Sequence, residues 1–330
     1  MLDIPRPVRS GWPWLAAAVT AATVVACGGG GGSTSDNGTL KLAMTDSPGC
    51  GYDHVWITVN KIRIHQSATA NPEDGGWREL AITPRKIDLL ALTNGALQEL
   101  GSLPLPAGRY EQARLVLSDA PLANSLVLSG TNNEIELRTP SAQTSGYKLK
   151  AHFEVTNNQV ADMVLDFDAC KSIVRAGNSG NYNLKPVVAV TKRLSTQIEG
   201  YVDPAIASSV VVSTRDPDNQ LRATVPDSTT GKFVIAYLPE NTNYTVVISG
   251  TGRTTAAVTG VPVSTAIGST RLNTSATPIA PPTSTTAQVT GTVTDAGSPP
   301  QALVDASVNA QQLLSTSQAL DVAWSLVDPV

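Results

Sequence analysis

A two-residue hydrophobic alternation recurs along this sequence and constrains its fold more than any other feature. Apolar side chains occupy every second position in Leu40–Met44, Val55–Val59, Leu149–Val155 and Met163–Phe167. Half-buried strands produce this period, because successive side chains point to opposite faces of a sheet. Charged residues make up only 15% of the chain, which also has 26 Gly and 22 Pro. This balance favours short strands and turns over long charged helices, so the sequence predicts a mostly β protein.

At 330 residues, the chain is long enough for more than one domain. Residues 39–194 contain the alternating runs and are predicted to form a β-sandwich or an open barrel. Residues 196–276 are a second predicted β-sandwich of short strands separated by Gly, Pro and Asn. Residues 277–287 are rich in Pro, Ser and Thr and are predicted to be a linker.

Two irregularities interrupt the alternation in the first domain. Parity slips after Val59, because Ile62 and Ile64 follow at even positions, and one extra residue near Asn60 would form a β-bulge. Ile87 to Leu97 has helical spacing that Asn94-Gly95 interrupts, so we expect at most a short helix or a turn there.

A third module is predicted to begin after the linker. VTGTVTD at 289–295 echoes IEGYVDP at 198–204, so residues 288–330 are interpreted as a partial third β module or a disordered tail. Roughly 45 residues are too few to bury a complete sandwich core. The alternative is a helix over Ala302–Leu326, which is rich in Ala, Gln and Leu.

The N-terminus has the layout of a signal peptide. Arg6 and Arg9 precede an apolar run from Trp12 to Ala26, and Cys27 follows small residues. About 15 helical residues rise only about 22 Å, short of the roughly 30 Å hydrocarbon core, so a permanent membrane span is the weaker interpretation.

Val24-Val25-Ala26-Cys27 resembles the lipobox of bacterial lipoproteins. The resemblance implies that residues 1–26 are removed and that Cys27 carries the lipid, with residues 27–38 as a Gly/Ser tether to the membrane. Gly28 stands where an Asp would resemble an inner-membrane retention signal, so the outer membrane is favoured, with its periplasmic or surface face left open. An ordinary secretory signal with an incidental cysteine is the alternative.

Two cysteines remain after that assignment, Cys50 and Cys170. Export would place them in an oxidising compartment, which favours a disulfide between them. The alternative is a pair of buried free thiols.

Five segments resemble, in the same order, those of a bacterial lipoprotein family catalogued as domain of unknown function 4382. They are TDSPGCGYDHVWITVNKIRIH at 45–65, IDLLALTNG at 87–95, LPAGRYEQARLVLSD at 105–119, LDFDACKSIV at 165–174 and NYNLKPVVAV at 181–190. The resemblance implies a lipobox and β-rich domains, and it implies no activity.

The stretch TTGKFVIAYLPENTNYTVVI resembles carboxypeptidase regulatory-like, transthyretin-like or Ig-like β-sandwich modules. The resemblance implies that Gly231 serves a turn and that Phe233 and Tyr244 face a core. The resemblance implies a stalk or spacer role, and some modules of this kind bind carbohydrate.

Asp162, Asp166 and Asp168 share one face of a predicted strand. Together with Asp46, Asp166 and Asp168 could supply the oxygen ligands that calcium requires. A solvated strand face explains the same residues. An acidic pair in the first domain would also be needed by a metal-dependent hydrolase, the least favoured function, and Asp166 and Asp168 are the only candidates.

Motifs of catalysis are missing from the sequence. It has no G-x-S-x-G, G-x-x-x-x-G-K-[ST] or H-E-x-x-H pattern, and its three histidines are too scattered for a zinc site. The net charge of −4 argues against nucleic acid as a partner. We therefore expect a non-enzymatic, lipid-anchored envelope or surface protein with a binding, adhesion or scaffolding role toward a protein or glycan ligand. Carbohydrate binding, with Trp56 and Trp77 as stacking faces, is the alternative.

Overall fold

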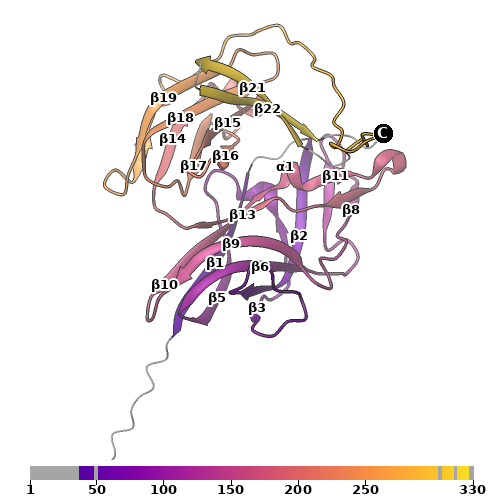
Figure 1. The fold of residues 1–330 in the computed structure, drawn as a ribbon. Coiled ribbons are helices and arrows are strands. Elements are labelled where there is room, and N and C mark those ends of the chain that lie inside the picture. Colours follow the sequence, from indigo (N-terminus) through magenta and orange to yellow (C-terminus); the bar gives the residue numbers. More distant parts are fainter. Residues whose placement is uncertain (1–36, 48–50, 304–306, 316–317, 327–330) are drawn as a thin grey trace, which may run out of the picture. The chain divides into compact units, whose positions relative to one another are not determined.

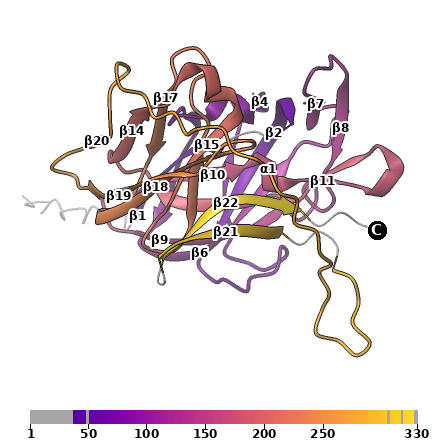
Figure 2. The ribbon, with the colours of Figure 1, turned by 90° about the horizontal axis from the view of Figure 1, so that it is seen from above.

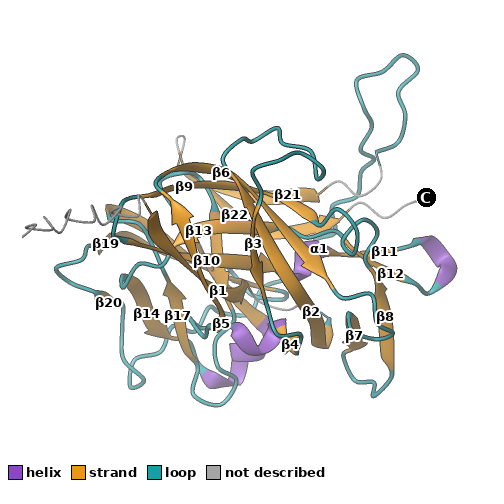
Figure 3. Ribbon diagram, turned by 90° about the horizontal axis from the view of Figure 1, so that it is seen from below, coloured by secondary structure: helices purple, strands orange, loops and turns teal. Residues whose placement is uncertain are grey.

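The computed structural model describes residues 37–47, 51–303, 307–315 and 318–326. Strands dominate the regular structure of these residues, as Figure 3 shows. The predicted mostly β fold class is therefore confirmed. Within the described ranges, no helix has both the length and the apolar character needed to cross a membrane.

The described residues of the first domain form thirteen strands and three short helical turns. In chain order these are β1 (Asn37–Ser47), β2 (Tyr52–His65), β3 (Arg78–Ala81), β4 (Lys86–Asp88), the 3₁₀ helix η1 (Leu89–Leu92), β5 (Gln98–Pro106), β6 (Gly108–Leu117), β7 (Ser125–Leu128), β8 (Glu134–Arg138), β9 (Tyr147–Val155), β10 (Val160–Asp168), α1 (Ala169–Ser172), β11 (Ile173–Arg175), the 3₁₀ helix η2 (Gly177–Ser179), β12 (Tyr182–Leu184) and β13 (Val188–Lys192).

Two sheets enclose the core of this domain (Figure 1). One has four strands in the order β13-β10-β1-β5, and the other has nine, with the path β11-β12-β8-β7-β2-β6-β9 and with β3 and β4 also paired to β2. Strands β1 and β10 are parallel, and their register places Leu42 beside Met163 and Met44 beside Leu165. Each of these four side chains is at most 2% exposed, which stabilises the fold by roughly 1.5–3 kcal/mol per side chain.

The two predicted irregularities are both present. The pairing of β2 with β6 shifts register between Val59 and Lys61, which keeps Val59, Ile62 and Ile64 all at 1% exposure or less. The expected short helix is η1. The side chain of Asp88 caps η1 by accepting a hydrogen bond from the backbone N–H of Leu90.

Seven strands and one helical turn form the second domain. They are β14 (Gln197–Tyr201), the 3₁₀ helix η3 (Pro204–Ser209), β15 (Val210–Arg215), β16 (Leu221–Thr224), β17 (Lys232–Ala236), β18 (Asn241–Gly250), β19 (Ala256–Val263) and β20 (Ser269–Arg271). The sheets β17-β14-β20 and β16-β15-β18-β19 enclose a separate core. As predicted, Phe233 and Tyr244 face this core, at 0% and 1% exposure. Gly231 has a φ of +69°, and a Cβ there would lie 2.0 Å from the carbonyl oxygen of Val202.

The C-terminal region contains a hairpin of β21 (Ser307–Ser315) and β22 (Gln318–Leu326). The alternative prediction of a helix over Ala302–Leu326 is therefore wrong for the described residues. Helix propensity is overridden here by strand pairing and by packing on the second domain, where Leu320 is 5% exposed. The preceding segment, predicted as a linker, contacts the same domain through bridges from Ile279 to Val202 and from Thr283 to Arg253.

Candidate functional site at the junction of the two β domains

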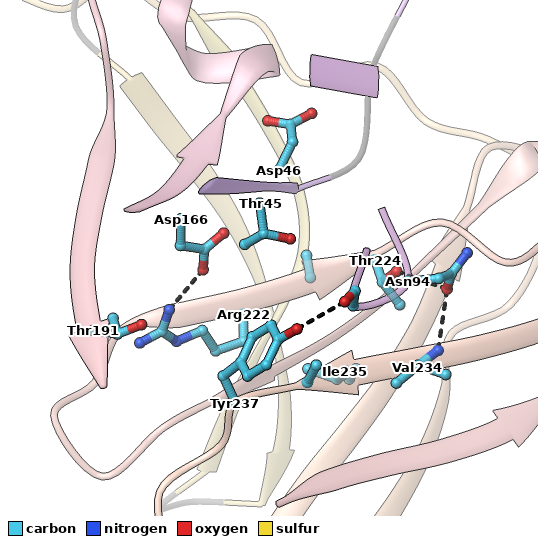
Figure 4. Close-up of a pocket in the computed structure, with 13 residues that line it drawn as sticks. Thr45, Asp46, Asn94, Asp166, Thr191, Arg222, Thr224, Val234, Ile235 and Tyr237 are labelled. Carbon is cyan, nitrogen blue, oxygen red and sulfur yellow. Dashed lines mark hydrogen bonds and ion pairs between the residues drawn. The ribbon is translucent and has the colours of Figure 1, made fainter. Parts of the chain in front are cut away.

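Arg222 lies where the first domain contacts the second, and its guanidinium binds a carboxylate from each. Its Nη1 is 2.6 Å from Oδ2 of Asp166, on β10 of the first domain. Its Nε is 3.1 Å from Oδ2 of Asp216, at the end of β15. The side chains of Arg222, Asp216 and Asp166 are only 7%, 2% and 16% exposed. We call these three residues the arginine clamp, and Figure 4 shows Arg222 with Asp166.

Local turn chemistry holds Asp216 in place. The turn from β15 to β16 brings the backbone N–H groups of Asp218 and Gln220 to 3.0 and 2.8 Å from Oδ1 of Asp216. Asn219 adopts a φ of +60° in this turn, a left-handed conformation that asparagine tolerates better than most residues. One oxygen of Asp216 therefore fixes the turn, while the other binds Arg222.

The electrostatics of the arginine clamp make it sensitive to the loss of one member. Removing charges from water costs several kcal/mol per ion, and only good pairing geometry offsets that cost. Two carboxylates share one guanidinium and leave a net charge of −1, so the clamp depends on the single positive charge of Arg222. Separating the two domains would break the ion pair between Arg222 and Asp166.

A second set of contacts comes from the turn at Asn94, which has a φ of 55° and is followed by Gly95 at 80°. The side chain of Asn94 uses both its donor and its acceptor on the second domain. Its Nδ2 donates to the carbonyl oxygen of Val225 at 2.9 Å, and its Oδ1 accepts from the backbone N–H of Val234 at 3.1 Å and from Oγ1 of Thr224 at 3.0 Å. Asn94 thus bonds to strands β16 and β17 or the residues beside them.

Further hydrogen bonds fix both ends of this contact. The hydroxyl of Tyr237 donates to the carbonyl oxygen of Gly95 at 2.7 Å, and burial raises the pKa of that phenol. On the other side, Oγ1 of Thr45 lies 2.9 Å from the carbonyl oxygens of Leu92 and Ala96. Thr45 therefore ties the turn that carries Asn94 to strand β1.

The hollow left at this junction has a volume of about 30 Å³. A cavity of this size admits a single water and no organic ligand. The residues around it therefore join the two domains by hydrogen bonds.

Asp46 follows Thr45 directly in the sequence, but its side chain lies on the other face of the sheet. The register pairs Thr45 with Asp166 and Asp46 with Phe167, so Asp46 shares the core face with the fully buried Phe167. Figure 4 shows the Asp46 carboxyl pointing away from Asp166. Oδ1 of Asp46 accepts from the backbone N–H of Ala169 at 2.9 Å, whereas its buried Oδ2 has no hydrogen-bond partner.

Burial raises the pKa of Asp46 well above its ordinary value of 3.8. The hydrogen bond from Ala169 opposes this shift, and the carboxylates of Asp168, Asp166 and Asp88 add to it. Folding therefore shifts Asp46 toward its neutral form relative to an exposed aspartate, as expected for a carboxyl with one unpaired buried oxygen.

The predicted calcium ligands Asp46, Asp166 and Asp168 do not converge on one face. Asp166 binds Arg222, and Asp168 binds the Nζ and backbone N–H of Lys171 at 2.7 and 3.0 Å while capping α1. In the ranges that the structure describes, no group of three or more His, Cys, Asp or Glu side chains could hold a metal ion.

The two tryptophans nominated for sugar stacking have occupied ring faces. The His54 ring stacks on Trp56 at 4.7 Å, and Nζ of Lys86 lies 4.6 Å from the Trp56 ring. Three further side chains lie within 4.7–5.5 Å of the Trp77 ring, namely Arg63, His65 and Arg114. Each ring is therefore already in contact with cationic or aromatic side chains of this chain.

The cysteine predictions fall largely outside the described residues. Cys27 and Cys50 belong to the ranges that are not described, and Cys170 is buried in α1 at 7% exposure. Lipidation of Cys27 and pairing of Cys50 with Cys170 stay predictions.

Sequence reasoning missed Arg222, Asp216 and Asn94 as site residues. In the sequence, Asn94-Gly95 indicates only an interruption of helical spacing. The signals present in the sequence are turn chemistry at Asn94-Gly95 and at Asp216, because such turns place polar side chains at the ends of strands.

Comparison with known proteins supports the family resemblance. Residues 37–186 match the model of a family described as domain of unknown function (DUF4382). No curated protein matches the chain.

Three solved structures match part of the chain at low identity. The Bacillus anthracis TIE protein has 11% identity and a TM-score of 0.16, and the match covers 72% of this chain and 33% of that one. GBS52, the minor pilin of Streptococcus agalactiae, has 12% identity and a TM-score of 0.18, with 76% and 99% covered. A mutant of the shaft pilin SpaA from Lactobacillus rhamnosus GG has 11% identity and a TM-score of 0.18, with 76% and 100% covered. The chain spans a third of the first of these, and TM-scores this low carry no argument.

Replacing Arg222 with methionine tests the arginine clamp. Arg222→Met keeps most of the side-chain volume but leaves Asp216 buried without its cation, so the free energy of unfolding should fall by roughly 3–5 kcal/mol. Urea-induced unfolding followed by circular dichroism measures this change. Arg271→Met is the matched control, because Arg271 pairs with Glu199 while 64% exposed, and it should cost less than about 1 kcal/mol. A loss of unfolding free energy in Arg222→Met no larger than that in Arg271→Met would show that the clamp does not determine stability.

Replacing Asp46 with asparagine tests the consequence of its raised pKa. The side-chain amide introduced by Asp46→Asn would keep an acceptor for the Ala169 N–H and carry no titrating group. In the native chain, the unfolded state loses a proton near pH 3.8 while the folded state keeps it. The free energy of unfolding should therefore fall by up to about 1.4 kcal/mol per pH unit, relative to Asp46→Asn, as the pH rises from 3.8 to the folded pKa. Parallel stability curves for the two proteins would contradict the burial of a neutral Asp46.

Proposed function

We propose that this protein is an exported, lipid-anchored envelope protein without catalytic activity, whose two β domains form a fixed scaffold for binding or adhesion. The observation that carries this proposal is the junction between the domains. The arginine clamp and the side chain of Asn94 join them by direct hydrogen bonds between side chains and between side chains and backbone.

A fixed junction suits a scaffold better than an enzyme that closes two domains on a substrate. Ligand pockets usually enclose about 300–1,000 Å³, whereas the hollow between these domains measures about 30 Å³. The buried ion pair and the three hydrogen bonds of Asn94 would all have to break for the junction to open. Such an arrangement preserves the spacing and orientation of surfaces.

The proposed anchor rests on the N-terminal sequence. Val24-Val25-Ala26-Cys27 places a cysteine directly after an apolar run and small residues, and two or more acyl chains on one cysteine give stable membrane attachment. The first described strand begins at Asn37, only ten residues after Cys27. The outer membrane is the proposed location, because Gly28 follows the cysteine.

The proposed disulfide between Cys50 and Cys170 fits an exported protein. Cys170 is buried in α1, and disulfides persist in oxidising compartments outside the cytosol. A cross-link over a loop of about 120 residues would stabilise the first domain by about 4–5 kcal/mol in the chain-entropy model.

Metabolic labelling with an alkyne fatty acid tests the anchor. The native chain should incorporate the label and fractionate with membranes, because the acyl chains would be attached to Cys27. Cys27→Ser should lose the label, and Cys170→Ser is the matched control that should keep it. Label retained by Cys27→Ser, or a native chain without label, would refute the lipid anchor.

A further inference from the structure

A pocket with a volume of about 390 Å³ lies on the first domain. Ligand pockets usually enclose about 300–1,000 Å³, so its size suits a small molecule. Strand β8 contributes Glu136, Leu137 and Arg138 to the lining, together with residues of its neighbour β12 and of the loops after β6 and β8. Figure 2 shows β7 and β8 side by side in this part of the first domain. The lining residues differ from those of the hollow at the arginine clamp.

Hydrogen bonds hold the two loops of this pocket against the sheet. In the loop after β6, Oδ1 of the buried Asn124 accepts from the backbone N–H of Thr58 at 3.1 Å, and its Nδ2 donates to the carbonyl oxygen of Ser118 at 2.8 Å. The loop after β8 is joined to β6, because the backbone N–H of Leu117 donates to the carbonyl oxygen of Ala142 at 3.2 Å. The pocket is therefore formed by the folded domain before a ligand arrives.

Charged side chains of both signs line this pocket. The carboxylates of Asp119 and Glu136 and the guanidinium of Arg138 are exposed, and none of them forms a hydrogen bond or ion pair within the described part of the chain. Glu134, two residues before Glu136 on the same face of β8, is different, because it accepts a hydrogen bond from the hydroxyl of Ser125 at 2.6 Å. Two carboxylates and one guanidinium are thus available to a ligand.

The spacing of these charges selects the length of a ligand. Glu136 and Arg138 are two residues apart on one strand face, so their Cα atoms are separated by about 7 Å. Asn183 on β12 is in register with Arg138 and adds a side-chain amide at that end. Two residues of extended peptide span at most about 7 Å. A dipeptide with free termini therefore matches the distance between the two charges.

We propose that this pocket binds a zwitterionic dipeptide, with its ammonium at the carboxylates of Glu136 and Asp119 and its carboxylate at Arg138 and Asn183. Charge-assisted hydrogen bonds of this kind are about twice as strong as neutral ones. A neutral sugar of the same size would displace water from three charged groups without supplying opposite charges, which costs free energy. The proposal rests on the binding role proposed above and names its ligand class. Loss of dipeptide binding would leave fatty-acid labelling and membrane fractionation unchanged, so the two proposals can fail separately.

Isothermal titration calorimetry on the full chain in an uncharged detergent tests this ligand class. Alanylalanine should bind saturably, with a Kd of about 0.1–1 mM. N-acetyl-alanylalanine lacks the ammonium and alanylalanine amide lacks the carboxylate, so each should bind about tenfold more weakly or worse. Maltose, a neutral molecule of similar size, should give no saturable heat. No saturable binding of alanylalanine, or equal affinity for the blocked peptides or for maltose, would overturn the proposal.

Substitutions on β8 test which end of the dipeptide each charge binds. Arg138→Gln should weaken alanylalanine by about tenfold but leave the affinity for alanylalanine amide unchanged, because the amide has no carboxylate for Arg138 to bind. Glu136→Gln should likewise weaken alanylalanine and leave the acetylated peptide unchanged. Arg175→Gln is the matched control, because Arg175 is exposed on β11 and does not line the pocket, and it should keep native affinity. Equal weakening of alanylalanine and its amide by Arg138→Gln, or weakening by Arg175→Gln, would refute the assignment.

Discussion

The guanidinium of Arg222 is bound by one carboxylate from each β domain, and the contact between the domains depends on it. The side chain is only 7% exposed and lies 2.6 Å from Asp166 and 3.1 Å from Asp216. A buried ion pair adds little net stability when it is complete, but it penalises any arrangement that separates its members. This asymmetry makes the arginine clamp a determinant of how the domains are held together.

The surrounding structure prepares the members of the clamp. The turn from β15 to β16 fixes Asp216 through two backbone N–H groups, and strand β10 presents Asp166 beside Thr45 of β1. Thr45 in turn holds the loop that carries Asn94. One face of the sheet that contains β1 and β10 thus supports both contacts. Asp166 forms the ion pair with Arg222, and Thr45 holds the loop whose Asn94 bonds to the second domain.

The sequence predicted the strands and the cores because these depend on local periodicity. Alternation identified β1, β10 and the bulge after Val59, and the position of Phe233 followed from its resemblance to known sandwiches. The junction could not be predicted in the same way. Arg222 and Asp166 are 56 residues apart, and Asn94 and Thr224 are 130 residues apart, so no local spacing connects them. Shared parity predicts one strand face for Asp166 and Asp168, and Asp46 was expected to join them, but the register of β1 with β10 places Asp46 and Asp166 on opposite faces.

The junction holds the two β domains as one body, and residual dipolar couplings test this rigidity most directly. Backbone amide couplings would be measured in one weakly aligned sample for β1–β13 and for β14–β20. A single alignment tensor should fit both sets, because the clamp and the Asn94 contacts prevent independent reorientation. Two tensors that differ in magnitude would show that the domains move independently and would contradict the account.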